Sequence, residues 1–291
     1  MFALALRTAC AYTHPVILST RDVSGEITSG CGTFIVINRD GYILTAAHVL
    51  RPYNLAKDHE KERGAYEEEV RRIRSDHKMN AKQKARAIKQ LPYNPKWICN
   101  SSFWWSRDGV SVKTFAIDQQ ADLAVGKLEP YDEKWNAQYP TFRNPSNPPE
   151  PGDFLCRLGF PLHKIKPIFH EDTNAFELPP ETFPIPFFPK EGMYTREAQI
   201  VDLKTSRIVK FIEMSTPGLR GQSGGPILDS QGRICAMQSQ TGFHPMGFSP
   251  KVIRGNREVE EHQFLGTGLG THVDEIVRLF KTVGISYDLS T

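Results

Sequence analysis

The segment Gly-Gln-Ser-Gly-Gly-Pro at 221–226 constrains the fold of this 291-residue chain more than any other feature. Three glycines flank Ser223, and glycine adopts backbone conformations that other residues rarely reach. The chain can therefore turn so that the backbone N–H groups of Gly221 and Ser223 point at one spot beside the serine hydroxyl. A serine nucleophile needs such donors and a neighbouring base. Without that base, the segment could equally be a flexible glycine turn.

Two further segments offer a base and an acid. His48 closes the apolar run Leu-Thr-Ala-Ala-His-Val at the end of an expected strand, and Asp122 directly precedes the apolar run Leu-Ala-Val. Alone, these residues would be a half-buried histidine and a turn aspartate. Asp118 is the nearest competing acid, but a polar Gln-Gln pair separates it from the strand. The chain order His, Asp, Ser is that of two-barrel proteases and differs from the order in subtilisins and α/β-hydrolases.

Apolar runs separated by turn residues predict a chain made mainly of β strands. Two Asp-Gly turns, at 40–41 and 108–109, predict hairpins in the first half. The expected strands are 15–20, 33–38, 42–45, 97–106, 111–117 and 123–128, followed by 154–160, 197–203, 207–214, 226–228 and 233–238.

Six prolines between residues 129 and 153 indicate a linker between two halves. We therefore expect an N-terminal domain at 1–140, which carries His48 and Asp122, and a C-terminal domain at 141–291, which carries Ser223. A cleft between the halves would bring the three residues together.

A charged insert at about 53–92 has a helical composition with a thin apolar stripe. Gly64 and Asn80 are candidate breaks, so we expect one broken helix or a helical hairpin. The insert is either a solvated surface extension or a docking element beside the active site.

Two segments of the second half differ from their surroundings. The loop at about 161–190 holds seven prolines and five phenylalanines and can form neither a helix nor a central strand. Apolar residues at helical spacing predict a closing helix at about 272–281, with Thr271 as its N-cap and Asp274 as the partner in a capping pair.

Charge and motifs exclude several classes of ligand. Between residues 53 and 90 there are eleven Lys or Arg against seven Asp or Glu, so this insert accounts for the net charge of +3 and leaves the remainder slightly acidic. A nucleic-acid-binding protein usually has a basic face on its main fold, so we expect no nucleic-acid partner. No phosphate loop, metal-ligand spacing or nucleotide fingerprint is present, and we expect no cofactor and no metal.

The five cysteines are widely spaced and odd in number, which is typical of thiols in a reducing compartment. The apolar run at 2–6 is interrupted by Arg7, unlike a secretory signal, and no apolar run approaches the roughly 18 residues of a membrane helix. We expect a cytoplasmic protein without a membrane partner, with a secreted or periplasmic location as the open alternative.

The chain resembles the trypsin-like serine peptidases, and most closely their bacterial, disulfide-free branch that includes the HtrA proteases. The resemblance spans nearly the whole chain apart from two inserts. The matching segments are 30–34, 45–49, 121–125, 158–161, 221–226 and 266–269, of which the three around His48, Asp122 and Ser223 are the most specific. It implies an all-β fold of two antiparallel six-stranded barrels packed across a cleft, with a helical insert in the first barrel and a C-terminal helix.

Carried over by motif, the resemblance implies a serine endopeptidase. Ser223 would attack the scissile carbonyl, His48 would carry the proton to the leaving amine, and Asp122 would orient the imidazole. The N–H groups of Gly221 and Ser223 would form the oxyanion hole.

Two departures from the family are informative. Members activated by proteolysis carry an aspartate just before the nucleophile, where this chain has Gln222, so activation of that kind is not expected. The HtrA relatives also carry a C-terminal peptide-binding PDZ domain, whereas this chain ends ten residues after its expected last helix. We expect regulation by the inserts, the closing helix or a protein partner.

By resemblance, the substrate pocket has its base just before the oxyanion loop and one wall on a following strand. The implied residues are Pro217, Gly218 and Leu219 at the base, Arg220 at the entrance, and Gln238, Ser239 and Gln240 along the wall. The base holds no acid, so we expect an uncharged, small-to-medium P1 residue. Arg220 could favour an acidic neighbouring residue or have a structural role.

Two other interpretations use the same residues. The chain could be a binding module on a protease fold, with its triad held inactive, or an esterase that uses the triad on activated esters only. Polypeptide is the expected substrate, and none of the three triad residues is missing.

Overall fold

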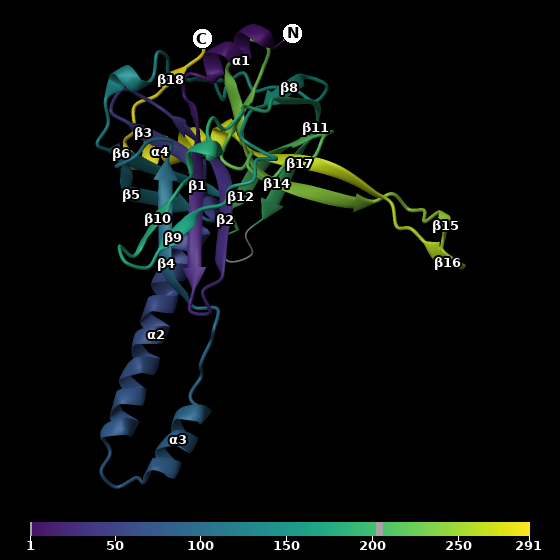
Figure 1. The fold of residues 1–291 in the computed structure, drawn as a ribbon. Coiled ribbons are helices and arrows are strands. Elements are labelled where there is room, and N and C mark those ends of the chain that lie inside the picture. Colours follow the sequence, from purple (N-terminus) through teal and green to yellow (C-terminus); the bar gives the residue numbers. More distant parts are fainter. Residues whose placement is uncertain (1, 202–205) are drawn as a thin grey trace.

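The chain folds as two β barrels, described over residues 2–201 and 206–291 of the computed structural model (Figure 1). The first is a nearly closed, six-stranded antiparallel sheet in the order β4-β1-β2-β3-β6-β5. Its strands are β1 (Thr13–Asp22), β2 (Ile27–Val36), β3 (Tyr42–Ala46), β4 (Ile98–Trp105), β5 (Ser111–Asp118) and β6 (Leu123–Glu129). The strands expected in the first half are confirmed, with β1 and β2 longer than the apolar runs alone indicated.

The turn at Gly41 shows why the β2–β3 hairpin forms here. Gly41 has a φ of +80°, a left-handed conformation that glycine reaches without strain. The hairpin then pairs Phe34 with Thr45, and the side chains of Phe34 and Leu44 are almost fully buried in one apolar core.

The second barrel closes through β13. Its strands follow the order β13-β8-β11-β12-β17-β14, and β13 also pairs with β14. They are β8 (Phe154–Arg157), β11 (Lys190–Val201), β12 (Ile208–Met214), β13 (Pro226–Leu228), β14 (Ile234–Pro245) and β17 (Phe264–His272), and the short strands β7 (Thr141–Phe142) and β18 (Asp288–Leu289) extend the sheet beside β14. The end of the strand expected at 197–203 lies outside the described residues. The fold class is therefore that of the trypsin-like two-barrel proteins, while the domain boundary near residue 140 stays a prediction.

The charged insert is a helical hairpin that projects from the first barrel (Figure 1). Helix α2 (Arg51–Ser75) continues through Gly64, and the break falls before α3 (Ala81–Gln90). Asn80 forms a capping box with Gln83, which satisfies N–H groups that the first turn of α3 leaves unpaired. Of the two candidate breaks, only Asn80 lies at a helix boundary, as the N-cap of α3.

The N-cap prediction for the closing helix was wrong by one residue. Helix α4 (Val273–Val283) has His272 as its N-cap, whose ring accepts a hydrogen bond from the N–H of Asp274. Thr271 faces the other way, and its hydroxyl donates to the carbonyl of Ala121 at 2.7 Å. Thr271 is therefore hydrogen-bonded to the other barrel and does not cap the helix, and a local sequence pattern does not reveal a contact of this kind.

The remaining helical elements described are a short helix, α1 (Ala3–Ala9), and the 3-10 turns η1 (Ala47–Leu50), η2 (Glu133–Trp135) and η3 (Pro180–Thr182).

A long β arm was not expected from the sequence. Strands β14 and β17 remain paired beyond the barrel, and β15 (Lys251–Arg254) and β16 (Arg257–Glu260) form its tip (Figure 1). The proline-rich loop at 161–190 holds the small hairpin of β9 (Ile168–His170) and β10 (Ala175–Glu177), outside both barrels, and the η3 turn. None of the described helices is long and apolar enough to cross a membrane.

Candidate active site

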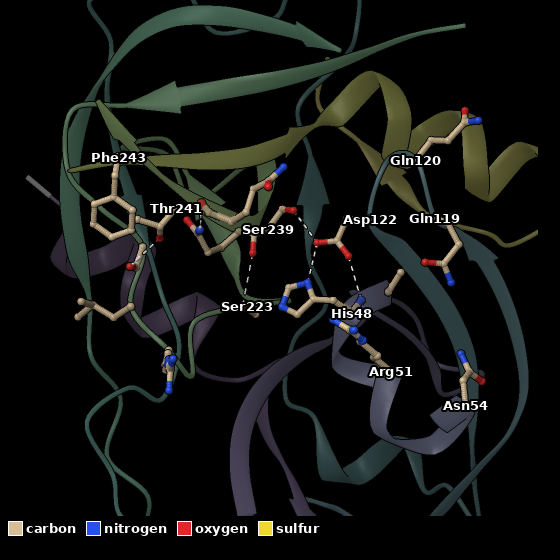
Figure 2. A pocket seen from close by; sticks show the side chains of 16 residues that line it. His48, Arg51, Asn54, Gln119, Gln120, Asp122, Ser223, Ser239, Thr241 and Phe243 are labelled. Atoms are coloured by element: carbon tan, nitrogen blue, oxygen red, sulfur yellow. Dashed lines mark hydrogen bonds and ion pairs between the residues drawn. The ribbon is translucent and has the colours of Figure 1, made fainter. Parts of the chain in front are cut away.

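The positions of His48 and Asp122 follow from the pairing of two strands. β3 and β6 pair so that Ala46 lies opposite Leu123, which places the residues beyond these strand ends side by side. The N–H of His48 donates to Asp122 Oδ1 at 2.9 Å, and His48 Nδ1 lies 2.8 Å from Asp122 Oδ2 (Figure 2). A carboxylate can only accept, so Nδ1 carries the proton and Nε2 is left as a base.

The turn that holds Asp122 is fixed by contacts from both barrels. Asp122 has a φ of +53°, which aspartate tolerates better than most residues. Asp118 accepts from the N–H of Ala121 and forms ion pairs with Arg207 and Arg278 at 2.8–2.9 Å. The two candidate acids therefore have different roles. Asp122 contacts His48, whereas Asp118 stabilises the turn that precedes β6.

Ser223 lies in a loop whose backbone packs against the first barrel and is hydrogen-bonded to it. Gly221 and Gly224 have φ values of +99° and +86°. A Cβ on Gly224 would collide with the carbonyl of Thr33, so the loop could not approach β2 with any other residue there. Thr33 donates from its N–H to the carbonyl of Ser223 at 2.8 Å and from its hydroxyl to the carbonyl of Gly221 at 2.7 Å.

The Ser223 hydroxyl is not hydrogen-bonded to His48 in the part of the chain that the structure describes. Its Oγ lies 3.5 Å from the carbonyl of Ser239, which is a weak contact (Figure 2). Apo active sites often show loose bonds of this kind that tighten when substrate binds.

The geometry of the oxyanion loop leaves two donors available. The N–H of Gln222 donates to the carbonyl of Leu219 at 3.0 Å, which closes a turn with Gly221 at positive φ. Across the described residues, neither the N–H of Gly221 nor that of Ser223 is committed to a hydrogen bond. Both are free to stabilise an oxyanion.

Two clefts meet at Ser223. The larger, of about 980 Å³, is lined by His48 and by residues of the oxyanion loop and β14, and the second, of about 820 Å³, runs past Cys31 and the start of the 161–190 loop. Six of the seven sequence-predicted substrate residues line the larger cleft: Gly218, Leu219, Arg220, Gln238, Ser239 and Gln240. Pro217 lies behind this lining, where its carbonyl accepts a hydrogen bond from Lys190 at 2.9 Å.

The structure adds a role that the sequence did not reveal. The hydroxyl of Ser239, expected only as a pocket wall, donates to Asp122 Oδ2 at 2.5 Å (Figure 2). Asp122 therefore accepts from three groups, which fixes its orientation. The residue lies in an ordinary polar run on β14, so no local signal distinguishes it.

The described residues give less support to a cysteine nucleophile or to a metal site than to Ser223 with His48 and Asp122. Burial raises the pKa of the Cys31 thiol to about 12, so it stays protonated near neutral pH. Among the described residues, no group of three His, Cys, Asp or Glu is arranged to hold a metal ion.

Comparison with known proteins places this geometry in a family. Residues 32–237 match the family model of the trypsin-like peptidase domain, whereas no curated protein matches the chain. Among solved structures, it is similar to the HtrA-type protease AlgW with a tripeptide (15% identity, TM-score 0.51, 97% of this chain and 63% of that one). A serine-to-alanine variant of AlgW with a decapeptide gives 12% identity, a TM-score of 0.51, and coverage of 97% and 66%.

At these identities the likeness concerns the fold, and this chain spans less than two thirds of the length of those proteases. The family model, in contrast, covers well over half of the residues, including His48, Asp122 and Ser223. The chain therefore belongs to the trypsin-like peptidase family, a family of serine endopeptidases.

Proposed function

We propose that this chain cleaves polypeptides through an acyl-enzyme formed on Ser223, with His48 as general base and Asp122 as the acid that orients it. The observation that carries the proposal is the double contact of Asp122 with the backbone and ring of His48, beside a serine in a glycine-rich loop. Three residues from two barrels meet in one cleft.

The mechanism follows from these contacts. Ser223 Oγ attacks the scissile carbonyl while its proton passes to His48 Nε2, and Asp122 stabilises the imidazolium that forms. The carbonyl oxygen becomes an oxyanion and accepts from the N–H groups of Gly221 and Ser223. The imidazolium then protonates the leaving amine, and a water deprotonated by His48 hydrolyses the acyl-enzyme.

The two clefts suit an extended peptide that passes Ser223. The larger cleft would hold the acyl side of the substrate, and the cleft past Cys31 and Leu162 the leaving side. AlgW structures that contain a decapeptide or a tripeptide support polypeptide as the substrate class.

The larger cleft offers no free carboxylate to a basic P1 side chain. Asp122 is the one carboxylate among the residues lining this cleft, and it is already hydrogen-bonded to His48 and Ser239, so a basic P1 residue is disfavoured. The sequence predicted an uncharged P1 residue, and the choice between uncharged and acidic residues depends on the groups behind the pocket.

We also propose that the helical insert regulates the enzyme through a protein partner. α2 begins at Arg51, directly after the η1 turn that carries His48, and both Arg51 and Asn54 line the larger cleft. Trp97 donates to Glu62 at 2.7 Å, which ties α2 to the start of β4. A partner bound to the hairpin would therefore act on the histidine side of the cleft.

The unbound Ser223 hydroxyl favours a second candidate, a protease restrained until substrate or a partner turns the serine toward His48. The two candidates differ in whether the isolated chain reacts with a small serine-directed probe.

Intact mass after incubation with a fluorophosphonate tests both. We expect one adduct on the wild-type chain and none on Ser223→Ala, and peptide hydrolysis lower by about 10⁶-fold in that variant. An adduct at any other residue would contradict Ser223 as nucleophile. A wild-type chain that reacts only after a peptide is added would identify the restrained form.

A further inference from the structure

Directly beneath the opening of the larger cleft lies the side-chain amide of Gln238. A Cβ on Gly218 would collide with this amide, so the amide forms the floor under that glycine. Gln238 is 2% exposed and donates from Nε2 to the carbonyl of Gln240 at 3.0 Å. Its Oε1 is buried and has no hydrogen-bond partner among the residues described. A glutamine amide can present either its oxygen or its nitrogen, so this group accepts polar ligands of either kind.

Behind that floor lies a fully buried arginine. In the β14–β17 pairing, Gly268 is opposite Thr241 of the cleft, and a Cβ on Gly268 would lie 2.7 Å from Arg157 Nη1. The guanidinium therefore fills the space that a side chain at Gly268 would occupy. Arg157 has 0% exposure and donates to Met214 Sδ at 3.0 Å, but its Nε and Nη1 have no partner within the described part of the chain.

A second cation reaches the same place. Lys190 pairs with Arg157 in the β8–β11 register, and its ammonium donates to the carbonyl of Pro217, the residue before Gly218 of the cleft. Burial and the charge of Arg157 lower the pKa of Lys190, and burial lowers that of Arg157 to about 10. Arg157 remains a cation near neutral pH, and no carboxylate among the described residues pairs with Arg157 or Lys190.

An unpaired buried cation is unfavourable for folding, because the protein interior does not replace its hydration. Such a charge is retained where an incoming anion compensates it. From this arrangement we infer that the S1 pocket selects an acidic P1 side chain, with Arg157 and Lys190 as the positive charge behind it and Gln238 as its polar floor. The inference rests on the proposed peptidase function and deepens it.

A peptide series that differs only at P1 tests the inference. Digestion of denatured, reduced casein, read by mass spectrometry, first identifies a well-cleaved site. The site is then synthesised as internally quenched peptides with Glu, Gln, Leu or Lys at P1. We expect kcat/KM to be at least about tenfold higher for Glu than for Gln, which has the same shape without the charge. Equal or faster cleavage of the Gln or Leu peptide would overturn the inference.

Two variants locate the selectivity. Arg157→Met removes the buried charge, and Gln238→Glu places a carboxylate on the floor with little change of shape. Both should lower the Glu/Gln ratio at least about fivefold, while Arg7→Met, an equal loss of charge on exposed α1, should leave the ratio at its wild-type value. A Glu/Gln ratio unchanged in both variants would remove Arg157 and Gln238 from the pocket.

The two levels of failure can be told apart. If the fluorophosphonate modifies Ser223 and casein is cleaved without preference for an acidic P1 residue, the inference fails and the peptidase stands. If Ser223 does not react and nothing is cleaved, the proposed function fails and the inference falls with it. A misfolded Arg157→Met is recognised by its thermal unfolding, and Gln238→Glu then decides.

Discussion

The two barrels differ in what they bury. In the first barrel the buried polar side chains are hydroxyls of Ser and Thr together with Asp22, and the rest of the interior is apolar. The second barrel and its closing helix bury four Arg, Asp or Glu side chains: Arg157, Glu213, Asp229 and Glu275. Three of these four have ion-pair partners of opposite charge, namely Arg196 for Glu213, Arg143 and Arg233 for Asp229, and Arg207 and Arg278 for Glu275.

We infer from this difference that the first barrel is a rigid scaffold for His48 and Asp122, and that the second barrel determines the choice of substrate. An apolar barrel holds His48 and Asp122 rigidly at its rim, because its packing leaves few alternative arrangements. The second barrel contains a charge that packing does not require, since Arg157 could be replaced by an apolar residue of similar length. We therefore expect changes in the first barrel to alter stability or the catalytic step, and changes at Arg157 to alter the choice of substrate.

The largest expected effect is on the acid of the first barrel. Asp122→Asn should lower kcat about 10⁴-fold with little change in fold, because an amide at this position favours the wrong imidazole tautomer. The measurement is kcat on the best casein-derived peptide, with circular dichroism as the check on folding. Asp118→Asn is the matched control, because Asp118 contacts Arg207 and Arg278 and not His48. A loss in Asp118→Asn as large as in Asp122→Asn would break the assignment of the two acids.

The joint between the barrels comes next. Gly224→Ala places a Cβ against the carbonyl of Thr33 at a φ of +86°, so Ser223 must move relative to His48. We expect activity to fall at least about 10²-fold and the free energy of unfolding by about 2–4 kcal/mol. Gly255→Ala, with a φ of +63° but nothing within 4 Å, shares the backbone strain without the collision. If both variants behave alike, the loop position does not depend on contact with β2.

The last pair of variants, for which we predict a change in stability alone, compares the two interiors directly. Leu44→Ala in the first barrel should lower the free energy of unfolding by about 2–5 kcal/mol, because Leu44 is fully buried among apolar neighbours. Arg157→Met in the second barrel should leave it unchanged or raise it, since the variant removes an unpaired buried cation. Urea unfolding of the two variants measures both quantities. A destabilisation of Arg157→Met equal to that of Leu44→Ala would show that the arginine is structural.

Local patterns predicted the elements of the fold well where the signal was local. The Asp-Gly turns marked the hairpins, and Asn80, a candidate break in the insert, lies at the start of α3. The same reasoning misplaced the N-cap of α4, because Thr271 is engaged by Ala121 of the other barrel. It also missed the β14–β17 arm, whose outer residues lack the clear alternation that marks a half-buried strand.

The catalytic residues were predictable for a related reason. The constraints on His48, Asp122 and Ser223 extend to their chain neighbours, such as glycines that must turn and apolar strands that must pair, so the motif can be recognised in the sequence alone. The chain neighbours of Ser239 carry no such constraints, so its contact with Asp122 cannot be recognised in the sequence. The sequence does show Arg157 as a charge inside the apolar run Phe-Leu-Cys-Arg-Leu. It does not show which residues lie around the guanidinium.

The sequence by itself determined the family, the order of the three catalytic residues and their division between two halves of the chain. Only the tertiary structure decided where the Ser223 hydroxyl points, that Ser239 contacts Asp122 and which charges lie behind the substrate pocket. The physical reason is the range of the interactions involved. Turns, caps and strand periodicity act over a few residues and therefore leave a local pattern. The pocket floor is formed where β8, β11, β14 and β17 meet, and the side chains that face one another there are far apart in the sequence.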